Sequence, residues 1–159
     1  MQKVLIPLKY KMKRVLIVFI ALLGYNALGQ SIDYNTKKGY VAGGYDVVSY
    51  FDGQAKAGLK EYTVTNDKVK FKFSSKENLL KFKENPNKYI PKYGGYCAYA
   101  VAVGGKKVGI NPETFEIRDG ELLLFYNSGR NNTLELWKKE SPDNLKAMAD
   151  KNWEKIKNR

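Results

Sequence analysis

The sequence contains no histidine and a single cysteine, Cys97, among its 159 residues. Without histidine, hydrolases of the serine–histidine or cysteine–histidine type are excluded, and a base near neutral pH would have to be a perturbed carboxylate or lysine. With one cysteine, the chain cannot close an internal disulfide or resolve its own sulfenic acid. A redox cycle at Cys97 would therefore need an external thiol or a partner protein.

The same scarcity restricts metal and cofactor chemistry. A structural zinc site takes four nitrogen, sulfur or carboxylate ligands, and one thiolate cannot supply it. The commonest axial ligand of haem is histidine, which this sequence lacks. Copper could recruit Cys97 together with Met148, the only methionine after Met12, but these are two soft ligands of unknown separation. We therefore predict no cofactor and no metal-binding residue, with copper or another metal as the weaker alternative.

Long apolar runs are scarce, and the one that stands out lies near the start of the chain. Val15–Leu23 follows the basic residues Lys11–Arg14 and has the length of a signal-peptide hydrophobic region, which is too short to span a bilayer comfortably. Small residues then place a cleavage site after Gly29. We predict a signal peptide over residues 1–29, with Met12 as an alternative start. The mature protein would be extracytoplasmic (periplasmic or secreted), touching a membrane only through an uncleaved leader.

Positive charge dominates the chain, with a formal net charge of +12. Five of the 28 basic residues lie in the first fourteen positions, where there is no acid, so 23 bases remain against 16 acids. These lysines alternate with apolar residues instead of clustering with arginine and aromatics, which favours a solubilising surface. We predict no nucleic-acid binding, because no groove-reading motif is present.

The length leaves room for one domain with its own core. We expect residues 30–39 to form a flexible lead-in and residues 40–159 to form the domain. Its predicted fold class is α+β: a small antiparallel sheet built from hairpins, with three to four helices packed on it.

Hydrophobic periodicity and turn residues predict the individual elements. A short buried strand should contain Val47, Val48, Tyr50 and Phe51. Hairpins are expected around the turns Asn66-Asp67 and Asp119-Gly120.

Helix start signals predict three further elements. A capping box of Ser74 and Glu77 should open a helix with Leu79, Leu80 and Phe82 inward, ending before Asn85-Pro86. A short helix should carry Leu134, Leu136 and Trp137. A terminal helix should begin at Ser141-Pro142, with Leu145, Met148, Ala149, Trp153 and Ile156 recurring at helical spacing.

The segment from residue 91 to 105, PKYGGYCAYAVAVGG, carries the chemically distinctive residue. Glycine pairs punctuate it at both ends, and we predict a short helix that opens near Tyr96 and places the Cys97 thiol in its first turn. Such a position favours a thiolate, and Lys92 would add to the effect. The alternative is that Cys97 is a small buried hydrophobic residue, as free cysteines most often are.

Three stretches of the sequence carry distinctive patterns: Gly43-Gly44-Tyr45-Asp46-Val47-Val48-Ser49-Tyr50-Phe51; Phe71-Lys72-Phe73-Ser74-Ser75 with Asn78, Phe82, Asn85-Pro86 and Tyr89; and Tyr93-Gly94-Gly95-Tyr96-Cys97-Ala98-Tyr99-Ala100-Val101. Together they resemble the YHS domain family, in particular its exported single-domain branch. The resemblance spans roughly residues 40–157.

The resemblance implies two competing properties. The wider family is similar to metal-sensing and metal-transport modules, whereas some relatives in this branch are selenoproteins with selenocysteine at the position of Cys97, which implies redox work. The metal-binding pattern places cysteines where this chain has Phe73-Ser74 and Asn78, Leu79 and Leu80, and this departure weakens the metal hypothesis.

We therefore predict an exported YHS-domain protein with a thiol redox or ligand-binding role centred on Cys97. The candidate ligand-binding residues are Lys92, Tyr93, Gly94, Gly95, Tyr96 and Tyr99, although the tyrosines also suit core and wall positions. The alternatives are a non-catalytic extracytoplasmic module that binds a metal or a partner, and a purely structural module. A conventional enzyme is not expected; an enzyme with this sequence would be a thiol-dependent oxidoreductase acting with a small molecule, external thiol or partner protein.

Overall fold

The computed structural model describes residues 32–159 and has the α+β class predicted from the sequence. The predicted signal peptide, residues 1–29, lies outside the described residues. The strands are β1 (Thr36–Lys37), β2 (Tyr40–Val41), β3 (Leu59–Asn66), β4 (Val69–Phe73), β5 (Asn111–Arg118), β6 (Glu121–Phe125), β7 (Asn127–Ser128) and β8 (Asn131–Asn132). The α-helices are α2 (Lys76–Glu84), α3 (Pro86–Tyr89), α4 (Ala98–Gly104), α5 (Thr133–Lys139) and α6 (Pro142–Ile156). Short 3₁₀ helices are η2 (Ala42–Gly44), η3 (Ser49–Asp52) and η4 (Lys92–Gly95).

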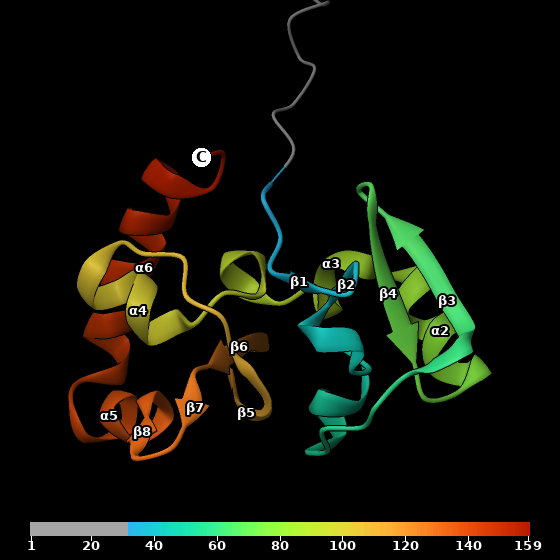
Figure 1. Cartoon of the computed structure of the whole chain (residues 1–159), viewed down its shortest axis with the longest axis horizontal. Coiled ribbons are helices and arrows are strands. Elements are labelled where there is room, and N and C mark those ends of the chain that lie inside the picture. Colours follow the sequence, from blue (N-terminus) through green and yellow to red (C-terminus); the bar gives the residue numbers. More distant parts are fainter. Residues whose placement is uncertain (1–31) are drawn as a thin grey trace, which may run out of the picture. The chain divides into compact units, whose positions relative to one another are not determined.

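Three small sheets organise the strands. The largest has the order β1-β2-β4-β3 and is antiparallel except for a short parallel pairing of β2 with β4, and the other two are the hairpins β5–β6 and β7–β8. Both hairpins predicted from the sequence, β3–β4 and β5–β6, are confirmed. In Figure 1 the β3–β4 hairpin with α2 lies on one side of β6, and α4, α5 and α6 lie on the other.

Strand β6 is buried on both faces and joins two hydrophobic clusters. Leu122 and Leu124 pack in the cluster that contains β2, β4 and α2, whereas Leu123 and Phe125 pack in the cluster that contains α4, α5 and α6. Successive strand side chains point to opposite faces, so one short strand supplies both cores. Each of these fully buried side chains contributes about 2 kcal/mol of transfer free energy.

The carboxylate of Asp46 is fully buried and accepts five hydrogen bonds. Its Oδ1 accepts the backbone N–H groups of Val48 at 2.9 Å and Ser49 at 3.3 Å. Its Oδ2 accepts the Ser74 N–H at 2.8 Å, the Ser74 hydroxyl at 2.6 Å and the Asn78 side-chain amide at 2.7 Å. Asp46 therefore ties the segment before η3 to the end of β4 and the start of α2.

This carboxylate also explains why the strand predicted over residues 47–51 is wrong. Val47 and Val48 form a turn that leads into η3 (Ser49–Asp52). The Asp46 side chain occupies the N–H groups two and three residues ahead, which turns the backbone away from an extended ladder. The predicted burial is confirmed for Val47, Val48 and Tyr50, whereas Phe51 is only partly buried.

Helix α2 begins one residue later than the predicted capping box. Its N-cap is Ser75, whose hydroxyl accepts the Asn78 N–H at 3.1 Å, because the Ser74 hydroxyl donates to Asp46 instead. The helix ends at Glu84, before Asn85-Pro86, as predicted. Phe82 is buried, but Leu80, predicted to point inward, is 48% exposed.

The flexible lead-in expected over residues 30–39 is wrong from Asp33 onward, where the backbone is hydrogen-bonded to the rest of the domain. The Asp33 N–H donates to the Lys157 carbonyl at 3.0 Å and the Asn35 N–H donates to the Gly94 carbonyl at 2.8 Å, while Tyr34 is buried. Strands β1 and β2 then form a hairpin. The polar composition of residues 33–39 hid these pairings because they are made mostly by the backbone.

Helices α5 and α6 confirm the C-terminal predictions. Ser141 is the N-cap of α6 and Pro142 its first residue. Trp137 is fully buried, whereas Leu136 and Met148 are 41% and 47% exposed. Within residues 32–159, no helix has the length and apolar character needed to cross a membrane.

We predict that Asp46→Ala lowers the free energy of unfolding by about 3 kcal/mol or more, because several buried donors lose their acceptor at once. Urea denaturation followed by circular dichroism measures this. The control is Asp52→Ala, which removes an exposed carboxylate at the end of η3 and is expected to change stability by less than about 0.5 kcal/mol. Equal losses for the two variants would contradict the role assigned to Asp46.

Candidate functional site

Cys97 lies at the start of α4, where it is the N-cap residue, one position before the predicted first turn. Its backbone is held on both sides: the N–H donates to the Val108 carbonyl at 2.9 Å, and the carbonyl accepts the Val101 N–H at 3.1 Å. The residue also bridges to Leu124 of β6. Its exposed fraction is 0%, so the thiol lies inside the core.

The thiol of Cys97 contacts one polar group, the hydroxyl of Thr133, at 3.3 Å. The Thr133 hydroxyl donates its own hydrogen to the Tyr126 carbonyl at 2.8 Å. The hydroxyl is therefore an acceptor toward sulfur, and the thiol is the donor. A thiol buried in this way is not accessible to the reactants that nucleophilic or exchange chemistry requires.

The predicted ligand-binding glycines, Gly94 and Gly95, lie where two backbone segments approach each other closely. A side-chain carbon at Gly94 would lie 2.5 Å from the Asp33 carbonyl oxygen, and the Gly94 φ of 58° also favours glycine. The Asn35 side chain donates to the Gly95 carbonyl at 2.9 Å. The Gly94-Gly95 pair therefore leaves room for residues 33–35 to pack against it.

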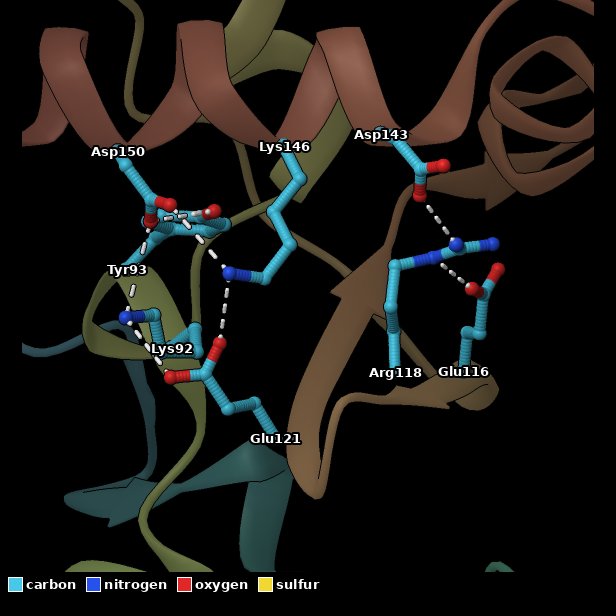
Figure 2. Close-up of polar contacts among 8 residues, drawn as sticks. All are labelled: Lys92, Tyr93, Glu116, Arg118, Glu121, Asp143, Lys146 and Asp150. Atoms are coloured by element: carbon cyan, nitrogen blue, oxygen red, sulfur yellow. Dashed lines mark hydrogen bonds and ion pairs between the residues drawn. The ribbon is translucent and has the colours of Figure 1, made fainter.

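Lys92 and Tyr93 belong to a closed network of paired charges (Figure 2). Lys92 Nζ lies 3.1 Å from Glu121 Oε1 and 3.7 Å from Asp150 Oδ1. Lys146 Nζ lies 2.9 Å from Glu121 Oε2 and 3.3 Å from Asp150 Oδ2. The Tyr93 hydroxyl donates to Asp150 Oδ1 at 3.0 Å. Two lysines and two carboxylates balance one another and connect η4, β6 and α6.

The network shifts the acidity of its members. Burial alone would raise the pKa of Glu121, but its hydrogen bonds with Lys146 and Lys92 outweigh burial and hold that pKa below its ordinary value. Burial and the nearby Asp150 raise the pKa of Tyr93, which stays a neutral donor. A site whose charges are already matched has no net charge with which to attract a ligand.

Lys92, Tyr93 and Gly94 do line a pocket of about 390 Å³ beside Trp153. Its charged lining residues are again balanced, with Lys92 and Lys157 against Glu121 and Glu154. The three predicted residues are therefore brought together at one small pocket.

The other predicted residues do not line that pocket. The Tyr96 hydroxyl donates to Asp33 at 2.9 Å, and burial together with this contact raises its pKa to about 12. The Tyr99 hydroxyl donates to Glu140 at 2.7 Å. Gly95 and Cys97 line neither of the two pockets described for residues 32–159.

The copper alternative paired Cys97 with Met148. Cys97 is fully buried, whereas the Met148 side chain is 47% exposed on α6. In the described part of the chain, no group of three or more histidine, cysteine, aspartate or glutamate residues stands close enough to hold a metal ion. The positions Ser74 and Asn78, where the metal-binding pattern places cysteines, bind Asp46 instead.

A larger pocket, of about 600 Å³, lies between the β1-β2-β4-β3 sheet and the start of β5. We call it the inter-sheet pocket. It is lined by Lys37, Lys38, Tyr40, Gly43, Tyr45, Lys72, Ile110, Asn111, Pro112, Glu113 and Asn127.

Backbone irregularities shape the inter-sheet pocket. The β5–β6 register shifts between Asn111 and Phe115, and such bulges bend a strand and redirect its side chains. Facing this bulge, Gly43 has a φ of 65°, a conformation that favours glycine. The Tyr45 hydroxyl donates to Glu113 Oε1 at 3.3 Å across the two sides.

Sequence reasoning did not identify the inter-sheet pocket. Its lining comes from residues 37–45, Lys72, residues 110–113 and Asn127, which are far apart along the chain. Gly43 and Tyr45 belong to a stretch that carries the YHS resemblance, and this was the one available signal. The alternation of its lysines with apolar residues favours a solubilising surface, so their charge gives no sign of a pocket.

We predict that Cys97 reacts with iodoacetamide only when the protein unfolds, because its thiol is buried and hydrogen-bonded. Mass spectrometry of alkylation over a urea series measures this, and labelling should follow the unfolding transition. A matched control is Ser128→Cys in a Cys97→Ser background, which places a thiol at an exposed position of β7 and should label without denaturant. Fast labelling of native Cys97 would contradict the burial.

We predict that Glu121→Gln lowers the free energy of unfolding at pH 7 by up to about 1 kcal/mol. A carboxylate whose folded pKa lies below 4.5 adds stability above its unfolded pKa and loses it as pH falls through the folded pKa. The variant should therefore lose less stability than the parent below pH 4.5.

Thermal unfolding across pH measures this difference. The control, Glu135→Gln, removes an exposed carboxylate whose nearest lysine, Lys138, is 3.9 Å away, and should leave the pH dependence unchanged. If the stabilities of Glu121→Gln and the parent changed in parallel with pH, the network would make no contribution to the pH dependence of stability.

Comparison with family models, with curated proteins and with solved structures finds no match to this chain. Its function must therefore be inferred from the buried thiol, the paired charges and the inter-sheet pocket of residues 32–159.

Proposed function

We propose that the chain is an exported YHS-type module that binds a small molecule and performs no chemistry of its own. The leader pattern of residues 1–29 supports export, and the three stretches that resemble the YHS family support the family assignment. The inter-sheet pocket supports the binding role. Thiol redox chemistry centred on Cys97 is the less favoured proposal.

The volume and lining of the inter-sheet pocket carry the proposal. Its volume of about 600 Å³ lies within the range of roughly 300–1,000 Å³ typical of small-molecule sites. Its walls combine the rings of Tyr40 and Tyr45 with the apolar side chains of Ile110 and Pro112, and lysines lie among them. Six of the eleven lining residues are charged or amide side chains, so this lining is more polar than that of most small-molecule sites and suits a polar ligand.

The surroundings of the pocket support binding by a preformed cavity. The Tyr50 hydroxyl donates to the Pro112 carbonyl at 2.7 Å and joins η3 to β5 behind the pocket. Asp46 holds the turn that precedes η3. Walls that are held in this way lose little freedom when a ligand binds.

The position of Cys97 argues against the redox alternative. Its sulfur has no exposed surface, and its one polar contact is a hydrogen bond with the Thr133 hydroxyl. Exchange with an external thiol or a partner protein needs a thiolate that the second sulfur can reach. We therefore assign Cys97 a packing role beside Ala98 and Val101.

A ligand screen by ¹H–¹⁵N NMR tests the proposal. The protein is expressed as the full chain and purified from the extracytoplasmic fraction, where its first residue is expected to be Gln30. A panel of aromatic and aliphatic fragments should shift amide signals around Tyr40, Tyr45 and Asn111.

The smaller pocket provides the internal control for this screen. Amide signals of Lys92, Tyr93 and Gly94 are expected to stay in place, because the charges there are already paired. Shifts confined to those three residues, or no shift with any fragment, would overturn the proposed site.

A further inference from the structure

The inter-sheet pocket has more positive than negative charge in its lining. Lys37, Lys38 and Lys72 face Glu113, the only acidic residue among the lining residues. None of the three lysines forms an ion pair with an acid in the described residues. Residues 1–31 contain no aspartate or glutamate that could supply a counter-charge.

Other lysines with little exposed surface in this domain do have acidic partners. The side chains of Lys146 and Lys107 are 18% and 17% exposed, and they lie 2.9 Å from Glu121 and 2.8 Å from Asp33. The half-buried Lys72 differs, since its Nζ lies over the Tyr40 ring, 4.1 Å from the centroid. A ring face attracts a cation but leaves its charge uncompensated.

The Lys72 side chain passes close to two glycines. A side-chain carbon at Gly58 would overlap Cβ of Lys72, and one at Gly44 would lie 3.6 Å from its Cδ. Gly58 and Gly44 are themselves joined by a backbone hydrogen bond of 2.9 Å. An ammonium group that already lies over Tyr40 loses less freedom on binding a ligand than a free surface lysine does.

The acid in the pocket is already engaged. Glu113 Oε1 accepts the Tyr45 hydroxyl, and burial together with the nearby Glu113 raises the pKa of Tyr45, so this hydroxyl keeps its proton. Glu113 makes no ion pair with Lys37, Lys38 or Lys72 among residues 32–159. The lysines remain available to a ligand.

We infer that the ligand of the inter-sheet pocket is a small organic anion, with a carboxylate or phosphate group directed at Lys72 and a planar or apolar part against Tyr40 and Tyr45. This inference rests on the proposed function and specifies its ligand class. Charge-assisted hydrogen bonds from lysine ammonium groups are the strong polar contacts that such an anion would gain.

Benzoate and benzamide test the charge requirement, because they have nearly the same shape and differ in charge. NMR titrations of the full chain at constant ionic strength give both dissociation constants. Benzoate is expected to bind about tenfold more tightly than benzamide. Inorganic phosphate should compete with benzoate, and added salt should weaken benzoate binding more than benzamide binding.

Lys72→Met and its matched control Lys70→Met assign the charge to one residue. Lys70 lies on the same face of β4 as Lys72 but does not line the pocket, so both variants remove one charge from the same surface. Lys72→Met should weaken benzoate binding about tenfold and leave benzamide binding unchanged, and Lys70→Met should change neither. Unchanged amide signals outside the pocket would show that Lys72→Met is folded.

The outcomes separate the two proposals. Equal affinities for benzoate and benzamide, or equal effects of the two lysine variants on benzoate, would overturn the anion inference while the ligand pocket stands. If neither these probes nor the fragment panel moves signals around Tyr40 and Tyr45, the ligand pocket itself is overturned.

Discussion

A buried carboxylate is the constraint on which the first half of this domain depends. Asp46 has no exposed surface, and a carboxylate in such a place is tolerated only when its oxygens are fully hydrogen-bonded. Its five donors come from Val48 and Ser49 at the start of η3, from the residue after β4 and from the start of α2. Satisfying Asp46 therefore brings three separate segments together and sets the turn that places Gly43 and Tyr45 opposite β5.

The second half is organised by β6 and by paired charges. Leu122 to Phe125 alternate between two hydrophobic clusters, so the strand cannot shift by one residue without exchanging both sets of side chains. Lys92, Glu121, Lys146 and Asp150 then join η4 and α6 to the start of that strand. Lysines serve as structural partners at this place, whereas around the inter-sheet pocket they lack acidic partners.

This contrast changes the interpretation of the segment around Cys97. Its glycines admit the backbone of residues 33–35, its tyrosines donate to Asp33, Asp150 and Glu140, and its thiol donates to Thr133. Most of the distinctive residues in this segment therefore hold parts of the fold together. The inter-sheet pocket, formed by segments that draw less attention in the sequence, has the larger volume and the unpaired charge.

Local signals in the sequence determined the elements that depend on near neighbours. Asp119-Gly120 specified its hairpin and Ser141-Pro142 began the terminal helix, because turn and cap preferences act within a few residues. Local patterns were insufficient where a side chain has a distant partner. The Ser74 hydroxyl binds Asp46, and Ser75 is therefore the N-cap of α2. The Asp46 side chain also binds the N–H groups of Val48 and Ser49, so the predicted strand is a turn followed by η3. The charge of each lysine was evident from the sequence, but whether it has an acidic partner depends on the packing of distant segments. Only the tertiary structure could therefore distinguish the paired Lys92 from the unpaired Lys72.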